Sequence, residues 1–103
     1  MYPYELEDSF YESMLADQMS KFNRYEFKHI LAHMIYHKKS FTDAQVTLFC
    51  DLCEKYQIGY SFVEIVQFIK ANDIVLSEEA IEKISNTWHR FSLINEDMLP
   101  FLR

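Results

Sequence analysis

Three histidines are the residues of this chain whose spacing best suits metal or proton chemistry. His29, His33 and His37 recur every four residues, which places them on one stripe of a helix. Two histidines one turn apart can hold zinc, and His89 would be the further ligand. No carboxylate stands beside them as in a metalloprotease motif, and Leu31 lies on roughly the opposite side of the helix. We therefore predict a solvated or interfacial face, pH-sensitive if it is an interface, and no metal site.

The two cysteines form a second motif with known chemistry, Cys50-x-x-Cys53. A redox pair needs a helix N-terminus to lower the pKa of one thiol, and a tetrahedral zinc site needs two more ligands. Both cysteines instead lie in the middle of a predicted helix, on its apolar side. Small core residues are the better explanation, and free thiols fit a reducing compartment.

No other motif indicates catalysis or a cofactor. A single glycine cannot form a glycine-rich phosphate loop, and no serine or cysteine stands in a recognisable strained turn. Carboxylates are frequent in residues 1–20, but they are typical of a solvent-exposed helix face. The sequence therefore predicts a protein that is not an enzyme and takes no cofactor.

The segments that carry these residues are predicted to be helices. One glycine and two prolines are too few to form the turns between many short strands. Apolar residues also recur with helical periodicity. We predict one all-α domain over residues 1–103, a compact bundle of about five helices, in which residues 95–103 form an extended C-terminal tail. The predicted helices cover about Glu5–Phe22, Arg24–Lys38, Asp43–Tyr56 and Phe62–Ala71, with a fifth that begins after Ser77.

The third and fourth predicted helices form a helix–turn–helix hairpin around which the bundle is organised. Thr42 with Gln45, and Ser61 with Glu64, have the spacing of a capping box at a helix start. Gly59 is predicted to end the third helix in the left-handed conformation that glycine adopts at little cost.

Apolar stripes on the helices predict which residues form the core. The predicted core-facing residues include Phe10 and Leu15 on the first helix, Phe49 on the third, and Ile81 and Trp88 on the fifth. The third helix carries further leucines beside its stripe, which predicts burial on two sides.

Charge is unevenly distributed along a chain whose net charge is −6. Residues 1–20 hold five acidic residues and no basic one, whereas residues 21–41 hold five basic residues and one acidic one. An acidic protein is repelled by a phosphate backbone, so general nucleic-acid binding is disfavoured. The outward residues of the fourth helix would be Glu64, Gln67 and Lys70. They do not match the Arg, Lys and Asn side chains expected at the start of a helix that reads a DNA groove. The basic segment is predicted to be a solvated face, with contact to a phosphate or an acidic partner as the alternative.

Membrane association is not predicted either. No apolar run approaches the length that spans a bilayer. The first residues have neither the basic nor the apolar region of a signal peptide, so we expect a cytoplasmic protein.

One family resemblance suggests a function. The segment Tyr60-Ser61-Phe62-Val63-Glu64, followed by Phe68-Ile69, Asn72, Ile74 and Glu82-Lys83-Ile84, resembles the late-transcription coactivators of T4-like bacteriophages. The resemblance covers roughly residues 52–103, and the fourth helix is about one residue shorter than in the family pattern. It implies a protein-binding adaptor that contacts the flap of the host RNA polymerase through the hairpin. The implied hairpin contacts are Tyr60, Phe62, Glu64 and Gln67.

The C-terminal residues extend this resemblance. The family ends in an acidic-hydrophobic tail that docks on the sliding clamp, and the corresponding residues here are Met98, Leu99, Phe101 and Leu102. Pro100 stands where an acidic residue is more usual, and it favours an extended backbone. Folding of the tail back onto the core is the equally weighted alternative.

A small acidic inhibitor from a phage or mobile element is the alternative function. The acidic first helix would then occupy the basic groove of a nucleic-acid-binding partner by charge complementarity. Its contacts would be Glu5, Glu7, Asp8, Glu12 and Asp17. A homo-oligomeric structural protein is a third hypothesis, and the sequence leaves the oligomeric state open.

Overall fold

The computed structural model describes residues 7–37 and 41–94, and all regular secondary structure in these ranges is α-helical. The prediction of an all-α bundle of about five helices is confirmed. The third predicted helix has the expected bounds, and the first ends at Ser20 rather than Phe22. The helices are α1 (Asp8–Ser20), α2 (Arg24–Tyr36), α3 (Asp43–Tyr56), α4 (Gly59–Ala71) and α5 (Glu78–Ile94). None of these helices is both long and apolar enough to cross a membrane.

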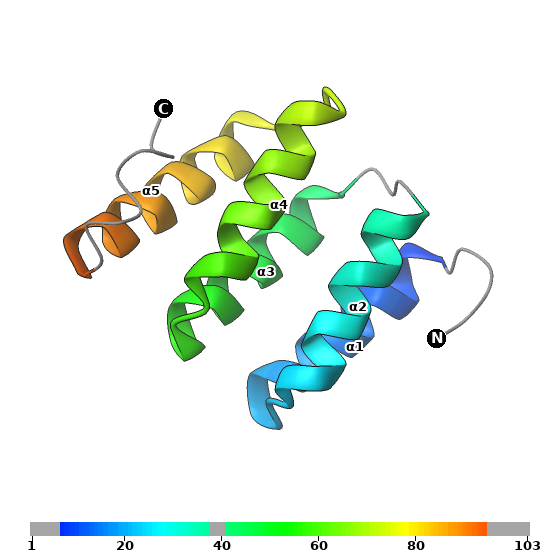
Figure 1. Cartoon of the computed structure of the whole chain (residues 1–103). Coiled ribbons are helices and arrows are strands. Elements are labelled where there is room, and N and C mark those ends of the chain that lie inside the picture. The colour runs from blue at the N-terminus through cyan, green and yellow to red at the C-terminus, as the bar shows by residue number, and fades with distance from the viewer. Residues whose placement is uncertain (1–6, 38–40, 95–103) are drawn as a thin grey trace.

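Helix α3 is the centre of the bundle. It packs against α1, α4 and α5, and α2 and α4 lie in front of α1 and α3 in Figure 1. Phe49 on α3 is buried, with ring centroids 5.8 Å from Phe27 and 5.5 Å from Phe41. Leu52 is fully buried and Leu48 partly, so the predicted two-sided burial of this helix is confirmed.

Three of the helix starts are capped by side chains close in sequence. Asn23 accepts hydrogen bonds from two N–H groups in the first turn of α2, at 3.0 and 3.1 Å. Thr42 and Gln45 form the predicted capping box, with both reciprocal bonds at 3.1 Å. The Ser77 hydroxyl accepts from an N–H in the first turn of α5 at 3.2 Å. These bonds satisfy donors that a helix leaves unpaired at its start.

The predicted start of α4 is wrong. The helix begins at Gly59, so Ser61 lies inside its first turn, and no side chain of the described residues caps it. Ser61 is buried because this part of the turn faces the core. The serine hydroxyl and Glu64 therefore do not form the predicted capping box.

The residue that ends α3 also differs from the prediction. Gln57, not Gly59, adopts the left-handed conformation, with φ 53° and ψ 53°. The N–H of Ile58 donates to the Cys53 carbonyl at 2.9 Å, which is the longer bond of a Schellman motif. Because this motif completes the turn by Ile58, α4 starts at once and Gly59 becomes its first residue. The same motif ends α4, where Asp73 has φ 49°.

Replacing Gln57 by glycine is expected to stabilise the protein by about 0.5–1 kcal/mol. A left-handed non-glycine residue costs about 1–2 kcal/mol, and the greater chain entropy of glycine offsets part of the gain. The measurement is urea denaturation followed by circular dichroism. Gln67→Gly is the matched control: Gln67 is exposed inside α4, so the same change should cost about 1 kcal/mol. A loss of stability in Gln57→Gly would contradict the left-handed assignment.

Two predicted core residues lie on the surface instead. Phe10 is 57% exposed and Ile81 is 55% exposed. On α1 the buried positions are Tyr11, Leu15 and Gln18, a stripe shifted by one residue from the one that includes Phe10. Trp88 is buried as predicted.

Candidate functional site

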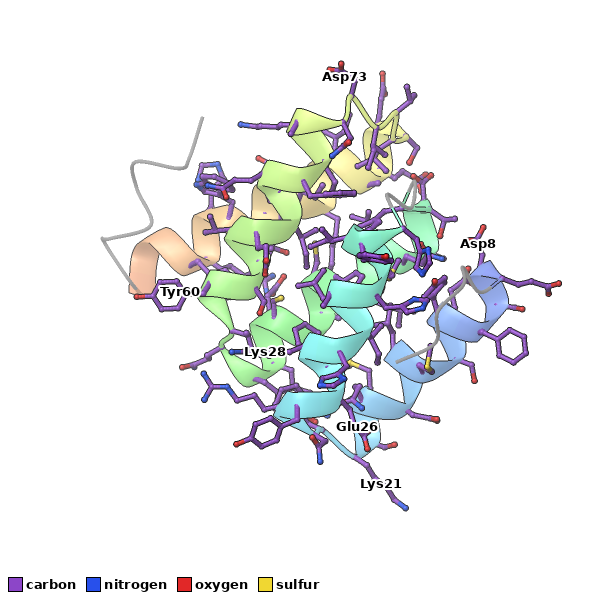
Figure 2. All side chains as sticks on the ribbon, turned by 45° about the vertical axis from the view of Figure 1, so that its right-hand side comes forward. Asp8, Lys21, Glu26, Lys28, Tyr60 and Asp73 are labelled. Carbon is purple, nitrogen blue, oxygen red and sulfur yellow. The ribbon has the colours of Figure 1, made fainter. Side chains whose placement is uncertain are left out.

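The outward face of α4 presents three of the four predicted hairpin contacts. Tyr60, Glu64 and Gln67 follow one another at spacings of four and three residues, so they share one stripe, and all are exposed. The Tyr60 side chain is 94% exposed, and it projects away from the bundle in Figure 2. We call these three residues the α4 stripe.

Phe62 does not belong to this surface. Its side chain is 1% exposed, and its ring lies 6.0 Å from Trp88 and 5.4 Å from Phe91, centroid to centroid. Phe62 therefore joins α4 to α5 in the core, and it is not available to a partner in this fold.

A groove of about 600 Å³ opens beside the α4 stripe, between α2 and the α3–α4 turn. Its lining combines apolar side chains from three helices and the turn with polar ones. We call it the α2/α4 groove. Among the lining residues are Phe22, Arg24, Lys28, Leu31, Ala32, Tyr56, Ile58, Tyr60 and Glu64.

Two stacked aromatic rings, Phe22 and Tyr56, line the groove, and we call this pair its floor. Phe22 and Tyr56 lie 4.1 Å apart between centroids, with an interplanar angle of 17°. The Tyr56 hydroxyl donates to the Met19 carbonyl at 3.1 Å, which ties α3 to the end of α1. Both rings are partly buried and packed against the core, although Phe22 lies in the loop between α1 and α2 and only Tyr56 is part of a helix.

The wall formed by α2 is basic. Arg24 and Lys28 are one turn apart, exposed, and without an ion pair among the residues that the structure describes. Figure 2 shows Lys28 extending from α2 towards α4. The sequence reasoning placed both residues in a basic segment but did not assign them to a site. Only the arrangement of the helices in the bundle brings Arg24, Lys28 and Tyr60 to the lining of one groove.

The acidic residues of α1 do not all lie on one face. Asp17 follows Asp8 by nine residues, which is about two and a half turns, so the two lie on opposite sides of the helix. Asp8 also accepts a hydrogen bond from the Gln45 side chain at 3.1 Å, which ties α1 to the start of α3. Glu7 is exposed and Glu12 is half-buried.

Five predicted contact residues lie outside the described residues. They are Glu5 and the C-terminal Met98, Leu99, Phe101 and Leu102.

The predicted solvated histidine stripe is wrong for its central member. His33 is 4% exposed, and its Nδ1 lies 2.8 Å from the Tyr11 hydroxyl in a buried hydrogen bond. His37 is half-buried, with its ring centroid 4.5 Å from that of His33, and only His29 is exposed. The reason is that Tyr11 of α1 reaches across to this side of α2, so the buried face of α2 is wider than its apolar stripe. In residues 7–37 and 41–94, no three potential metal ligands come together.

The cysteines are core residues, as predicted. Both are buried and neither forms a disulfide. Burial raises the pKa of Cys50 to about 11, and burial also raises the pKa of Cys53 well above its usual range. Both side chains are therefore protonated thiols at neutral pH, which fits apolar packing.

Comparisons of this chain with protein-family models, with curated proteins and with solved structures found no match. The resemblance to phage transcription coactivators therefore stays a prediction.

Proposed function

We propose that this protein is a non-enzymatic adaptor that binds another protein through the α4 stripe and the adjoining α2/α4 groove. The observation that carries the proposal is Tyr60, a large aromatic side chain that is 94% exposed beside a groove of about 600 Å³. Tyrosine is enriched among the residues that supply most of the binding energy in protein interfaces, and such anchors fill pockets. Tyr60 is therefore positioned to anchor a partner at the edge of the groove.

The family resemblance suggests the identity of the partner. The residues that carry it include Tyr60 and Glu64, both of which lie in the α4 stripe. In this proposal the stripe binds bacterial RNA polymerase in the host cytoplasm, and the tail residues Met98–Leu102 bind the sliding clamp. The protein would then link transcription to replicating DNA without reading DNA sequence itself.

Tyr60→Ala is expected to weaken binding to purified bacterial RNA polymerase by at least about tenfold, as is usual for truncation of an aromatic anchor. Immobilised full-length protein and surface plasmon resonance provide the measurement. Tyr36→Ala is the matched control because Tyr36 is also largely exposed, at 74%, but lies outside the groove. Both variants should keep the thermal stability of the wild type within about 0.5 kcal/mol.

A variant that ends at Glu96 separates the two proposed contacts. It should keep polymerase binding and lose binding to the sliding clamp. If the full-length protein binds neither, the adaptor proposal fails.

The acidic-inhibitor alternative predicts a different pattern. Neutralisation of Glu7, Glu12 and Asp17 to the corresponding amides would abolish capture of its partner from host lysate, while Tyr60→Ala would leave that capture unchanged. The opposite placement of Asp8 and Asp17 on α1 favours the adaptor, because these two carboxylates cannot face one basic groove at the same time.

A further inference from the structure

We propose that the α2/α4 groove binds a short acidic segment of the partner, in which Asp or Glu residues alternate with large apolar side chains. This inference rests on the proposed adaptor function and specifies the chemistry that its binding surface recognises.

The floor of the groove suits apolar side chains. Phe22 and Tyr56 form a stacked pair there, and Leu31 and Ile58 line the groove beside them. A volume of about 600 Å³ falls in the range of sites that enclose a few side chains or a small ligand. Burial of leucine or phenylalanine side chains against this floor would provide most of the affinity.

The walls of the groove suit a negatively charged segment. Arg24 and Lys28 line one wall, and Glu64 is the single acidic residue among the described residues that line the groove. Arg24 and Lys28 form no ion pair among the described residues, so neither cation is already neutralised by a carboxylate there. The groove is therefore locally basic on a chain whose net charge is −6. Such a local field selects anionic partners and steers their approach.

The start of α4 adds to the same field. Gly59, Tyr60 and Ser61 line the groove, and in the part of the chain that the structure describes no side chain caps the N–H groups of this first turn. A helix N-terminus carries a partial positive charge, which favours carboxylates over cations beside Arg24 and Lys28.

A peptide fits these features better than a nucleic acid does. A nucleic-acid strand presents a row of phosphates, and the groove offers only two cationic side chains on an otherwise acidic protein. An acidic-apolar peptide satisfies both the floor and the wall.

Selection from a phage-displayed library of random short peptides on the full-length protein tests the inference. The enriched sequences should combine Asp or Glu with Leu, Ile or Phe. Lys28→Glu should weaken binding of the best synthetic peptide about tenfold, measured by fluorescence anisotropy. Lys21→Glu is the matched control, because Lys21 is exposed, carries the same charge and does not line the groove. It should change binding less than about twofold. Circular dichroism checks that both variants are folded.

Three results would overturn the inference. The first is selection of no peptide or of basic peptides. The second is that Lys28→Glu and Lys21→Glu weaken peptide binding equally. The third is that a single-stranded oligonucleotide binds more tightly than the best peptide. The adaptor proposal is tested separately with RNA polymerase. If Tyr60→Ala abolishes polymerase binding and Lys28→Glu does not, the adaptor stands and the acidic-segment inference fails. If the peptides behave as expected but polymerase does not bind, the inference about the groove stands and the identity of the partner is wrong.

Discussion

Phe49→Ala is expected to lower the free energy of unfolding by about 3–5 kcal/mol, the usual loss when a buried phenylalanine is truncated. Phe49 is 1% exposed, and it lies on α3, which packs against α1, α4 and α5. Two aromatic rings also contact Phe49. Phe27 of α2 meets it edge-on, and Phe41, which precedes the N-cap of α3, is stacked on it. Because these neighbours come from different parts of the bundle, they cannot all move in to fill the cavity. Domains of this size have a total stability of about 5–15 kcal/mol, so the variant should lose a large share of it.

Urea denaturation followed by circular dichroism measures this loss. Phe10→Ala makes the same chemical change at a position that is 57% exposed, and it should cost much less than Phe49→Ala. Phe49→Leu keeps most of the apolar volume and provides a folded variant if Phe49→Ala fails to fold. Equal losses in Phe49→Ala and Phe10→Ala would contradict a core centred on α3.

Tyr11→Phe is expected to lower the free energy of unfolding by about 1–3 kcal/mol, the cost of leaving a buried polar atom without its hydrogen bond. Tyr11 is fully buried, and its hydroxyl lies 2.8 Å from Nδ1 of His33, which is also buried. The substitution removes only the hydroxyl, so packing between α1 and α2 is otherwise kept. The loss therefore reports on the hydrogen bond rather than on a cavity.

Tyr25→Phe is the matched control for this experiment. Tyr25 is 78% exposed, so loss of its hydroxyl should change the stability by less than about 0.5 kcal/mol. The same denaturation assay serves both variants. If Tyr11→Phe is as stable as the wild type, the bond to His33 contributes nothing to the interface of α1 and α2.

The part of the fold that could be predicted from the sequence depends on short-range interactions. The capping box of Thr42 and Gln45, and the cap at Ser77, join residues three positions apart, so local geometry suffices to form them. The bounds of α3 followed from its cap and from a regular apolar stripe. The shared face of Glu64 and Gln67 likewise follows from helical periodicity alone, whereas Tyr60 joins it only because α4 begins at Gly59.

Local signals failed where two of them competed. Ser61 with Glu64 has capping-box spacing, and Gly59 is a good residue for a left-handed turn, but neither takes that role. Gln57 adopts the left-handed conformation instead, although this is unfavourable for a non-glycine residue. A turn completed at Gln57 lets α4 start early and bury Ser61 and Phe62. The gain from burial exceeds the cost of one left-handed glutamine, and that comparison requires the packed structure.

The sequence by itself determined that this chain forms helices, where most of them begin, and that Glu64 and Gln67 share one face of α4. These properties depend on residues within one or two turns of each other, for which spacing is sufficient. Only the tertiary structure decided that His33 is buried against Tyr11, and that Arg24 and Lys28 line one groove with Tyr60. These contacts join different helices, and their geometry is set by how the apolar faces pack around α3. A helical pattern specifies the direction of each side chain from its own axis, but packing alone specifies which other helix it meets.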